Sequence, residues 1–156
     1  MEEKPLIVKQ LESLIEEEPH WLPVMANAAA LLYEMLPDLN WAGFYLVRGE
    51  ELILGPFQGK AACIRIPYGK GVCGTAWQED CCIRVPDVHE FPGHIACDSA
   101  SNAEIVIPLH ADGKVAAVLD LDSPVKERFT AADEEILLAF AGALEEKACL
   151  QALPEI

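Results

Sequence analysis

The sequence has few basic residues, no long apolar run and no N-terminal signal pattern. Only 11 of its 156 residues are Lys or Arg, against 26 Asp and Glu, so the formal net charge is −15. This charge repels nucleic-acid backbones and anionic membranes. The longest apolar run, near residues 28–32, is far shorter than the roughly 20 residues that cross a bilayer. Since the acidic residues 1–5 precede no apolar signal core, we expect a cytoplasmic protein without nucleic-acid or membrane partners.

Cysteine is too scarce for a disulfide scaffold. Six cysteines in 156 residues lie below the roughly 8–10% of small disulfide-stabilised domains. A chain of this length is expected to form one domain that buries about two-thirds of its unfolded surface, so it needs no covalent staples. We therefore predict a single domain over residues 1–156 with reduced thiols. A disulfide in a reducing compartment usually has a catalytic or regulatory role.

Hydrophobic periodicity predicts an α+β domain. Two helical segments precede a strand pair, a loop-rich middle, a β-hairpin at Asp112-Gly113 and a last helix with Thr130 as its N-cap. Consecutive hairpins favour an antiparallel sheet with helices packed on it. The expected ranges are residues 9–18 and 23–36 (N-terminal helices, within 1–37), 41–47 and 52–54 (strands), 55–101 (the loop-rich segment), 104–109 and 114–122 (the hairpin that ends a sheet over 40–122), and 130–149 (the C-terminal helix).

Three carboxylates are expected at one end of the hairpin. Glu104 begins its first strand, and Asp120 and Asp122 share one face at the end of its second strand. A strict two-residue turn would put Glu104 on the opposite face, so a bulge or a longer turn near Pro108 is needed to bring the three together. The alternative is a solvated strand end. The alternation of Leu and Asp inside an otherwise apolar run weighs against that alternative.

Two aromatic residues on the first predicted strand share a face. Trp41 and Tyr45 are four residues apart, and side chains alternate along a strand. Core packing is the more ordinary role for such a pair. The functional alternative is an aromatic wall for a ligand methyl or thioether group, because contacts between sulfur and aromatic rings are favourable.

Five of the six cysteines fall in the loop-rich segment. Three of them are candidates for reactive thiols: Cys63, Cys73 and Cys97, the last within H-I-A-C-D-S at residues 94–99. A thiol in a polar loop can ionise and react, whereas a thiol on a packed helix is usually inert. Dithiol chemistry between Cys73 and Cys97 is therefore weighed evenly against a role for each as a small buried residue.

Two other motifs carry weaker signals. Residues 69–74 match G-x-G-x-x-G, but a dinucleotide site needs a buried strand before it and a long helix after it, so we expect a tightly turning loop. His94 and Cys97, with Cys81 or Cys82, would be the ligands of a structural zinc site, yet only His94-x-x-Cys97 has the usual ligand spacing. We therefore predict no metal and no cofactor.

Six short motifs carry a family resemblance. They are N-W-A-G-F-Y at 40–45, G-K-G-V-C-G at 69–74, V-P-D-V at 85–88, H-I-A-C-D-S at 94–99, S-N-A-E-I-V at 101–106 and L-D-L-D-S at 119–123. Together they closely resemble the free methionine-(R)-sulfoxide reductases, which are single GAF domains. The resemblance spans roughly residues 41–140. It implies a GAF-like, six-stranded antiparallel sheet flanked by helices, with a small-molecule pocket beneath the loop-rich segment.

The resemblance also implies a reaction and a set of site residues. The reaction is reduction of free L-methionine (R)-sulfoxide to L-methionine by a thiolate, through a sulfenic acid and an intramolecular disulfide that thioredoxin recycles. Cys97 matches the nucleophile, while Cys73 and Cys63 match two further redox cysteines, with Cys73 the expected resolving thiol. The substrate-binding positions are Trp41, Tyr45, Glu104, Asp120 and Asp122.

Two other functions compete with this one. A sensory GAF module would bind a small ligand without turnover and would be expected beside an output domain. A peroxide-responsive thiol switch would need neither the carboxylates nor the aromatic wall. The partners implied by the reductase are free methionine sulfoxide and a thioredoxin-type reductant, in a response to oxidative stress. A homodimer is compatible with the sequence.

Overall fold

A six-stranded antiparallel sheet lies at the centre of the molecule. The computed structural model describes residues 3–94, 99–147 and 150. The strand order is β3-β2-β1-β6-β5-β4, so the predicted six-stranded sheet flanked by helices is confirmed. The elements are α1 (Leu6–Leu14), α2 (Trp21–Met35), β1 (Trp41–Arg48), β2 (Glu51–Gly59), β3 (Arg65–Pro67), α3 (Gly71–Glu79), β4 (Ile83–Val85), the 3-10 helix η1 (Val88–Glu90), β5 (Ala103–Ala111), β6 (Lys114–Ser123) and α4 (Ala131–Lys147).

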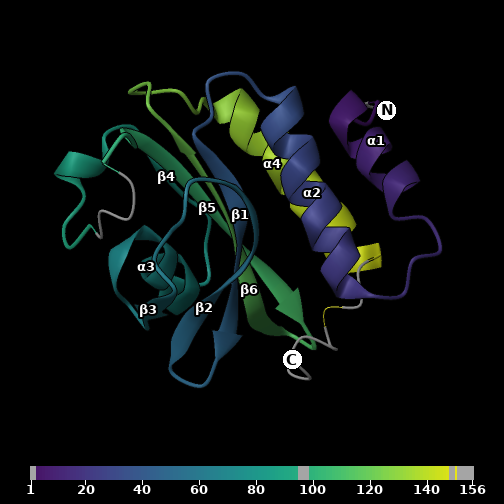
Figure 1. Ribbon diagram of the computed structural model, residues 1–156, viewed down its shortest axis with the longest axis horizontal. Helices are drawn as coiled ribbons and strands as arrows, with labels where there is room; N and C mark the ends of the chain where they lie inside the picture. Colours follow the sequence, from purple (N-terminus) through teal and green to yellow (C-terminus); the bar gives the residue numbers. More distant parts are fainter. Residues whose placement is uncertain (1–2, 95–98, 148–149, 151–156) are drawn as a thin grey trace.

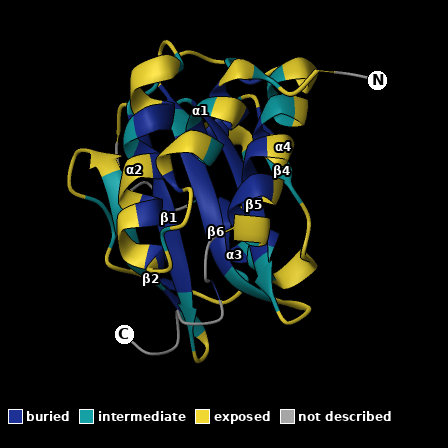
Figure 2. Cartoon of the chain, turned by 90° about the vertical axis from the view of Figure 1, so that its right-hand side faces the viewer, coloured by how far each residue is buried: buried dark blue, intermediate teal, exposed yellow. Residues whose placement is uncertain are grey.

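The helices form two unequal layers (Figure 1). Helices α1, α2 and α4 cover one face of the sheet, and α3 packs on the other face against β5 and β6. The central strands β1, β5 and β6 are therefore buried on both faces, as Figure 2 shows in dark blue. Side chains of β1 alternate between the layers. Phe44 and Leu46 pack under the helices, whereas Trp41 and Tyr45 belong to a second cluster beneath α3.

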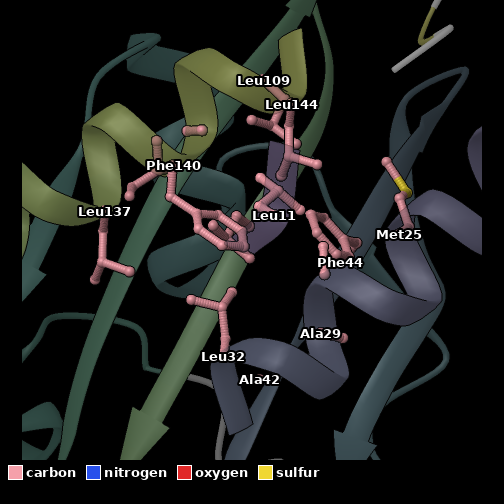
Figure 3. Packing of buried hydrophobic residues seen from close by; sticks show 14 of the residues in the cluster. Leu11, Met25, Ala29, Leu32, Ala42, Phe44, Leu109, Leu137, Phe140 and Leu144 are labelled. Carbon is pink, nitrogen blue, oxygen red and sulfur yellow. The ribbon is translucent and has the colours of Figure 1, made fainter. Parts of the chain in front are cut away.

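The layer under α1, α2 and α4 is an apolar core. Leu11, Leu32 and Phe140, one from each helix, gather around Phe44 of β1, and none of the four is exposed to solvent (Figure 3). Truncating such a buried aromatic to Ala typically costs about 3–5 kcal/mol. Among the residues that the structure describes, this layer buries no ionisable group, so it forms a stable support for the more polar face behind it.

Helix boundaries follow local capping. Asp133 donates its backbone N–H to Thr130 Oγ1 (3.1 Å), and the Thr130 N–H is donated to Asp133 Oδ2 (2.9 Å), which confirms Thr130 as the cap of α4. Helix α2 begins at Trp21, earlier than predicted, because the His20 ring accepts the Leu22 N–H and Pro23 fits the first turn. Within the described ranges, no helix has both the length and the hydropathy needed to cross a membrane.

The segment expected to be loop-rich holds more regular structure than predicted. It contains the end of β2, all of β3, α3 and β4, and η1. The expected tight turn is present at Gly69, which has a φ of 75°, but residues 71–74 of the glycine motif begin α3 rather than continue a loop. A Cβ at Gly74 would lie 2.7 Å from the Pro67 carbonyl oxygen, so this glycine lets the helix pack tightly against the end of β3.

A histidine joins three elements at the edge of the sheet. His110 of β5 lies with Nδ1 2.8 Å from Glu145 of α4 and Nε2 2.6 Å from Asp80, which ends α3. The hydrogen bond with Asp80 is the main cause of a raised His110 pKa, and Glu145 acts in the same direction. Both ring nitrogens can donate only in the protonated form.

We predict that His110 stabilises the fold more in acid than in alkali. The pKa of His110 is raised in the folded state. Its contribution to the free energy of unfolding is therefore complete below the usual histidine pKa of 6.5 and is lost as pH rises through the folded pKa. His110→Gln should lower the melting temperature by about 1–3 °C at pH 6, since half-exposed pairs contribute roughly 0.2–1 kcal/mol. The difference should vanish near pH 9. If the difference in melting temperature between the variant and the wild type does not change with pH, the protonated His110 does not stabilise the fold through Asp80 and Glu145.

Candidate active site

The pairing of β5 with β6 brings the three carboxylates to one face. Glu104 lies opposite Asp122, and Asp122 in turn lies opposite Trp41 of β1. The register shifts between Leu109 and His110, near the hairpin turn. The bulge that the sequence required for Glu104 to share a face with Asp120 and Asp122 is therefore confirmed.

These carboxylates form the floor of a pocket. Trp41 and Tyr45 lie on the same floor, and the first turn of α3 (Lys70–Cys73) forms one wall. Residues 61–62, Ile66, His94 and Ser101 complete the described lining. The enclosed volume is about 40 Å³, and the empty volume is about 530 Å³ when the mouth open to solvent is counted. The structure thus brings together all the predicted substrate-binding residues.

A third aromatic ring, that of Phe57, supports the predicted aromatic pair without lining the pocket itself. Trp41 stacks on Tyr45 with ring centroids 5.8 Å apart and on Phe57 of β2 with centroids 5.1 Å apart. Phe57 was missed from the sequence because Gly55 and Pro56, which are unusual within a strand, led to a predicted strand end at residue 54. The wall also holds the neighbouring loop, since the Trp41 indole N–H is donated to the Lys60 carbonyl (3.2 Å).

Tyr45 fixes the same loop from its other end. Its hydroxyl donates a hydrogen bond to the Cys63 carbonyl oxygen at 2.9 Å. Burial is the main cause of a raised Tyr45 pKa, and the neighbouring Asp120 acts in the same direction, so the phenol stays protonated and remains a donor. The segment that carries Cys63 is therefore attached to the pocket floor by two aromatic side chains.

Gly43 allows Phe57 of β2 to pack closely against β1. It lies between Trp41 and Tyr45 on β1, pairs with Asp120 of β6, and faces Phe57 across the β1–β2 ladder. A Cβ at Gly43 would come within 2.3 Å of the Phe57 Cβ, which no pair of real atoms tolerates. The missing side chain lets Phe57 pack close to β1 and reach Trp41.

Two of the carboxyl groups are buried with little compensation. Glu104 is 7% exposed and Asp120 is 5% exposed. Burial raises the pKa of both, and the negative charge of Asp120 raises the pKa of Glu104 further, as that of Asp122 does for Asp120. Asp120 Oδ1 has no hydrogen-bond partner among the described residues. The floor therefore offers a protonated carboxyl that can donate a hydrogen bond and an anionic site that attracts a cation.

The described cysteines differ in state. Cys73 is a free, buried thiol whose Sγ donates a long hydrogen bond to Glu104 Oε2 (3.9 Å). Burial and the adjacent Asp120 raise its pKa, so it stays a thiol at neutral pH. Cys63 is disulfide-bonded. Cys73, Cys81 and Cys82 are free. Cys97 and Cys149 lie outside the described residues.

The cysteine pair of the zinc alternative lies elsewhere. Cys81 and Cys82 line a separate cavity beside α4, whereas His94 lines the carboxylate pocket. Cys82 is half-buried, and burial raises its pKa to about 12. This separation argues against a zinc site that combines His94 with either cysteine.

The first turn of α3 is a part of the pocket lining that the sequence did not reveal. Lys70 precedes the helix in an extended conformation, and no side chain caps the exposed N–H groups. Gly71, Val72 and Cys73 line the pocket, so the positive end of the helix dipole faces it. The glycine motif at residues 69–74 marked this place in the sequence, but the residues around it did not predict a helix.

We predict that neutralising Glu104 stabilises the fold. A carboxyl with a raised folded pKa costs stability as pH rises, because the unfolded state ionises first. Glu104→Gln should therefore match the wild type near pH 4 and melt about 3 °C or more higher at pH 8. The exposed Glu135→Gln is the control and should show no such trend. A lower melting temperature for Glu104→Gln at every pH would contradict the prediction.

Comparison with known proteins places this geometry in a family. The GAF domain family model matches residues 8–146. The chain is 55% identical to Protein YtsP of Bacillus subtilis over 143 residues, covering 90% of this chain and 88% of that protein. It is 52% identical to the free methionine-R-sulfoxide reductase of Escherichia coli, covering 88% of this chain and 84% of that protein.

A solved structure agrees with these matches. The structure of fRMsr of Staphylococcus aureus in complex with its substrate has a TM-score of 0.87 and 50% identity, covering 91% of this chain and 93% of that chain. The resemblance inferred from the six motifs is thereby confirmed. This chain is a single GAF domain and belongs to the family of the free methionine-(R)-sulfoxide reductases.

Proposed function

We propose that this protein reduces free L-methionine (R)-sulfoxide to L-methionine. The observation that carries the proposal is the floor of the pocket, where buried carboxyls lie beside an aromatic wall. The Escherichia coli relative is named for this reaction, and the Staphylococcus aureus fRMsr binds its substrate on the same fold. A sulfoxide combines a hydrogen-bond acceptor with an apolar methyl group, and this floor provides a partner for each.

The floor suits the sulfoxide end of the substrate. Glu104 or Asp120, protonated because burial raises its pKa, donates a hydrogen bond to the sulfoxide oxygen. That bond withdraws electrons from the sulfur and makes it more electrophilic. Trp41 and Tyr45 provide the apolar surface against which the methyl group packs.

The rest of the pocket suits a free amino acid. The remaining anionic charge among Glu104, Asp120 and Asp122 attracts the α-ammonium. The uncapped first turn of α3, with Lys70 at its start, attracts the α-carboxylate. A methionine sulfoxide within a polypeptide lacks both charges, so these two regions together select the free amino acid.

We assign the covalent chemistry to cysteines. The Cys97 thiolate attacks the sulfoxide sulfur, the oxygen passes to the Cys97 sulfur as a sulfenic acid, and methionine leaves after one proton is taken up. A second thiol then attacks the sulfenic sulfur, water leaves, and a disulfide forms. Support for Cys97 comes from its position in sequence between His94 and Ser101, which both line the pocket.

The resolving thiol is either Cys63 or Cys73. The family resemblance favoured Cys73, but Cys63 is the one that is disulfide-bonded, whereas Cys73 is a free thiol with a raised pKa. A protonated, buried thiol is a poor nucleophile. We therefore propose Cys63 for resolution and a polar role on the floor for Cys73. A thioredoxin-type dithiol of a reducing compartment such as the cytoplasm then completes the cycle.

The deciding experiment is an assay with the separated epimers of free methionine sulfoxide and dithiothreitol. Consumption of the R epimer with stoichiometric formation of methionine is expected. Binding of the sulfoxide without consumption of either epimer would instead indicate a sensory GAF module.

We predict that three cysteine variants separate the two chemical steps. Cys97→Ser should form no methionine even with dithiothreitol, because no other thiol attacks the substrate. Cys63→Ser should complete a first turnover, measured as one methionine per chain, yet fail to cycle with thioredoxin. Cys73→Ser is the matched comparison. If it loses thioredoxin-dependent cycling more severely than Cys63→Ser, Cys73 is the resolving thiol.

We also predict that the pocket recognises the α-ammonium by charge. N-acetylation of methionine sulfoxide removes that charge and keeps the sulfoxide. Loss of a charged hydrogen bond typically costs roughly 1.5–3 kcal/mol, so kcat/KM should fall roughly ten- to a hundredfold. Methyl esterification of the carboxylate provides a comparison at the α3 end. Equal kcat/KM for the free and N-acetylated substrates would show that the carboxylates do not bind the ammonium.

A further inference from the structure

The pocket floor also contains a set of metal ligands. Cys73, Glu104 and Asp120 are all buried, and one donor atom from each lies within 4.8 Å of the other two. The donor atoms around a tetrahedral zinc ion are roughly 3.3–3.8 Å apart, given bonds of about 2.0–2.3 Å. The Cys73 Sγ and Glu104 Oε2 atoms are already separated by 3.9 Å. Small side-chain shifts would therefore complete a three-ligand site.

A second, independent observation points to a missing cationic partner. Asp120 lines the pocket and is 5% exposed, and its buried Oδ1 atom has no hydrogen-bond partner among the described residues. A buried carboxylate oxygen without a partner is costly, and a bound cation removes that cost. The three ligands come from α3, β5 and β6, which are packed against one another, so little conformational freedom would be lost on binding.

We infer that, in the reduced protein, Cys73, Glu104 and Asp120 bind one zinc-class divalent cation, which excludes the substrate from the pocket. A thiolate with two carboxylates favours zinc-class ions over magnesium and calcium, which prefer oxygen ligands alone. The enclosed 40 Å³ accommodates the fourth ligand, a water molecule that needs about 10–15 Å³. On binding, the Cys73 thiol releases its proton to solvent. The exclusion of substrate rests on the proposed function.

This site is inhibitory rather than catalytic. The cation occupies the place proposed for the ammonium and the sulfoxide oxygen, because all three are drawn to Glu104 and Asp120. Cys73 is redox-inactive in the proposed cycle, so the metal sequesters a thiol that the chemistry does not consume. A cation bound there would block the reductase without oxidising it.

The test is a titration of the full-length protein with Co²⁺ after reduction with tris(carboxyethyl)phosphine. A thiolate bound to Co²⁺ gives a charge-transfer absorption in the near ultraviolet, which requires no activity to observe. We expect this band to saturate at one Co²⁺ per chain and to be displaced by Zn²⁺. Added L-methionine, the proposed product, should raise the apparent Co²⁺ dissociation constant severalfold.

Variants assign the ligands. Cys73→Ser should lose the band, whereas the double variant of Cys81→Ser and Cys82→Ser, which removes the thiols beside α4, should retain it. Glu104→Gln guards against a folding defect in Cys73→Ser, because we expect it to be the more stable protein; its Co²⁺ affinity should fall about tenfold or more. A band that is absent from the wild type, or that survives in Cys73→Ser, overturns the inference.

The outcome is separable from the proposed function. If neither epimer of methionine sulfoxide is consumed but the Co²⁺ band requires Cys73 and Glu104, the metal site stands and only substrate exclusion fails. If the epimer is consumed and no thiolate band appears, the reductase stands and the metal site is rejected. A band that disappears only with Cys81 and Cys82 would place the ion beside α4 and reject the site proposed here.

Discussion

The register of β5 against β6 is the constraint on which the pocket depends. A shift of one residue would turn Glu104 into the apolar layer around Phe44, since side chains alternate between faces. The bulge that prevents this adjoins His110, at the end of the hairpin away from the pocket. Asp80 and Glu145 both contact His110, at the point where the register shifts.

One face of the sheet carries the apolar core that stabilises the fold, and the other face carries the polar groups of the pocket. Among the described residues, the side chains buried in the layer under α1, α2 and α4 are almost all apolar, and their packing offsets the cost of the opposite face. On that face Glu104 and Asp120 are buried with the same sign of charge and beside a thiol. Such groups weaken a fold and are retained where chemistry needs them. Both proposed ligands, an amino-acid ammonium and a divalent ion, relieve the same electrostatic strain.

Strong periodicity and turn chemistry made most of the scaffold predictable. The hairpin, its required bulge and the Thr130 cap were inferred from residues whose local preferences agree with the final structure. The site was harder because its other wall departs from those preferences. Glycines at the start of α3 concealed a helix whose stability comes from packing, and Gly55-Pro56 concealed the strand that carries Phe57.

The cysteines show a different limit of sequence reasoning. Whether a thiol is ionised or bonded depends on its surroundings in space, and spacing along the chain does not give them. Cys73 is surrounded by acids from β5 and β6, which lie 31 or more residues away in the sequence. The preference for Cys73 over Cys63 as the resolving thiol was based on resemblance alone, and it could not anticipate that environment.

Gly43 has a consequence for how this pocket can evolve. No side chain fits between Trp41 and Tyr45 unless the backbone at Phe57 moves, so a substitution of Gly43 cannot fill the centre of the floor. We expect the sequence changes that alter the shape of the pocket to occur instead in the surrounding segments, which are the loop at residues 60–63 and the first turn of α3. Natural or engineered variants that accept a new substrate would therefore differ at the rim of this pocket and keep Gly43 at the centre of its floor.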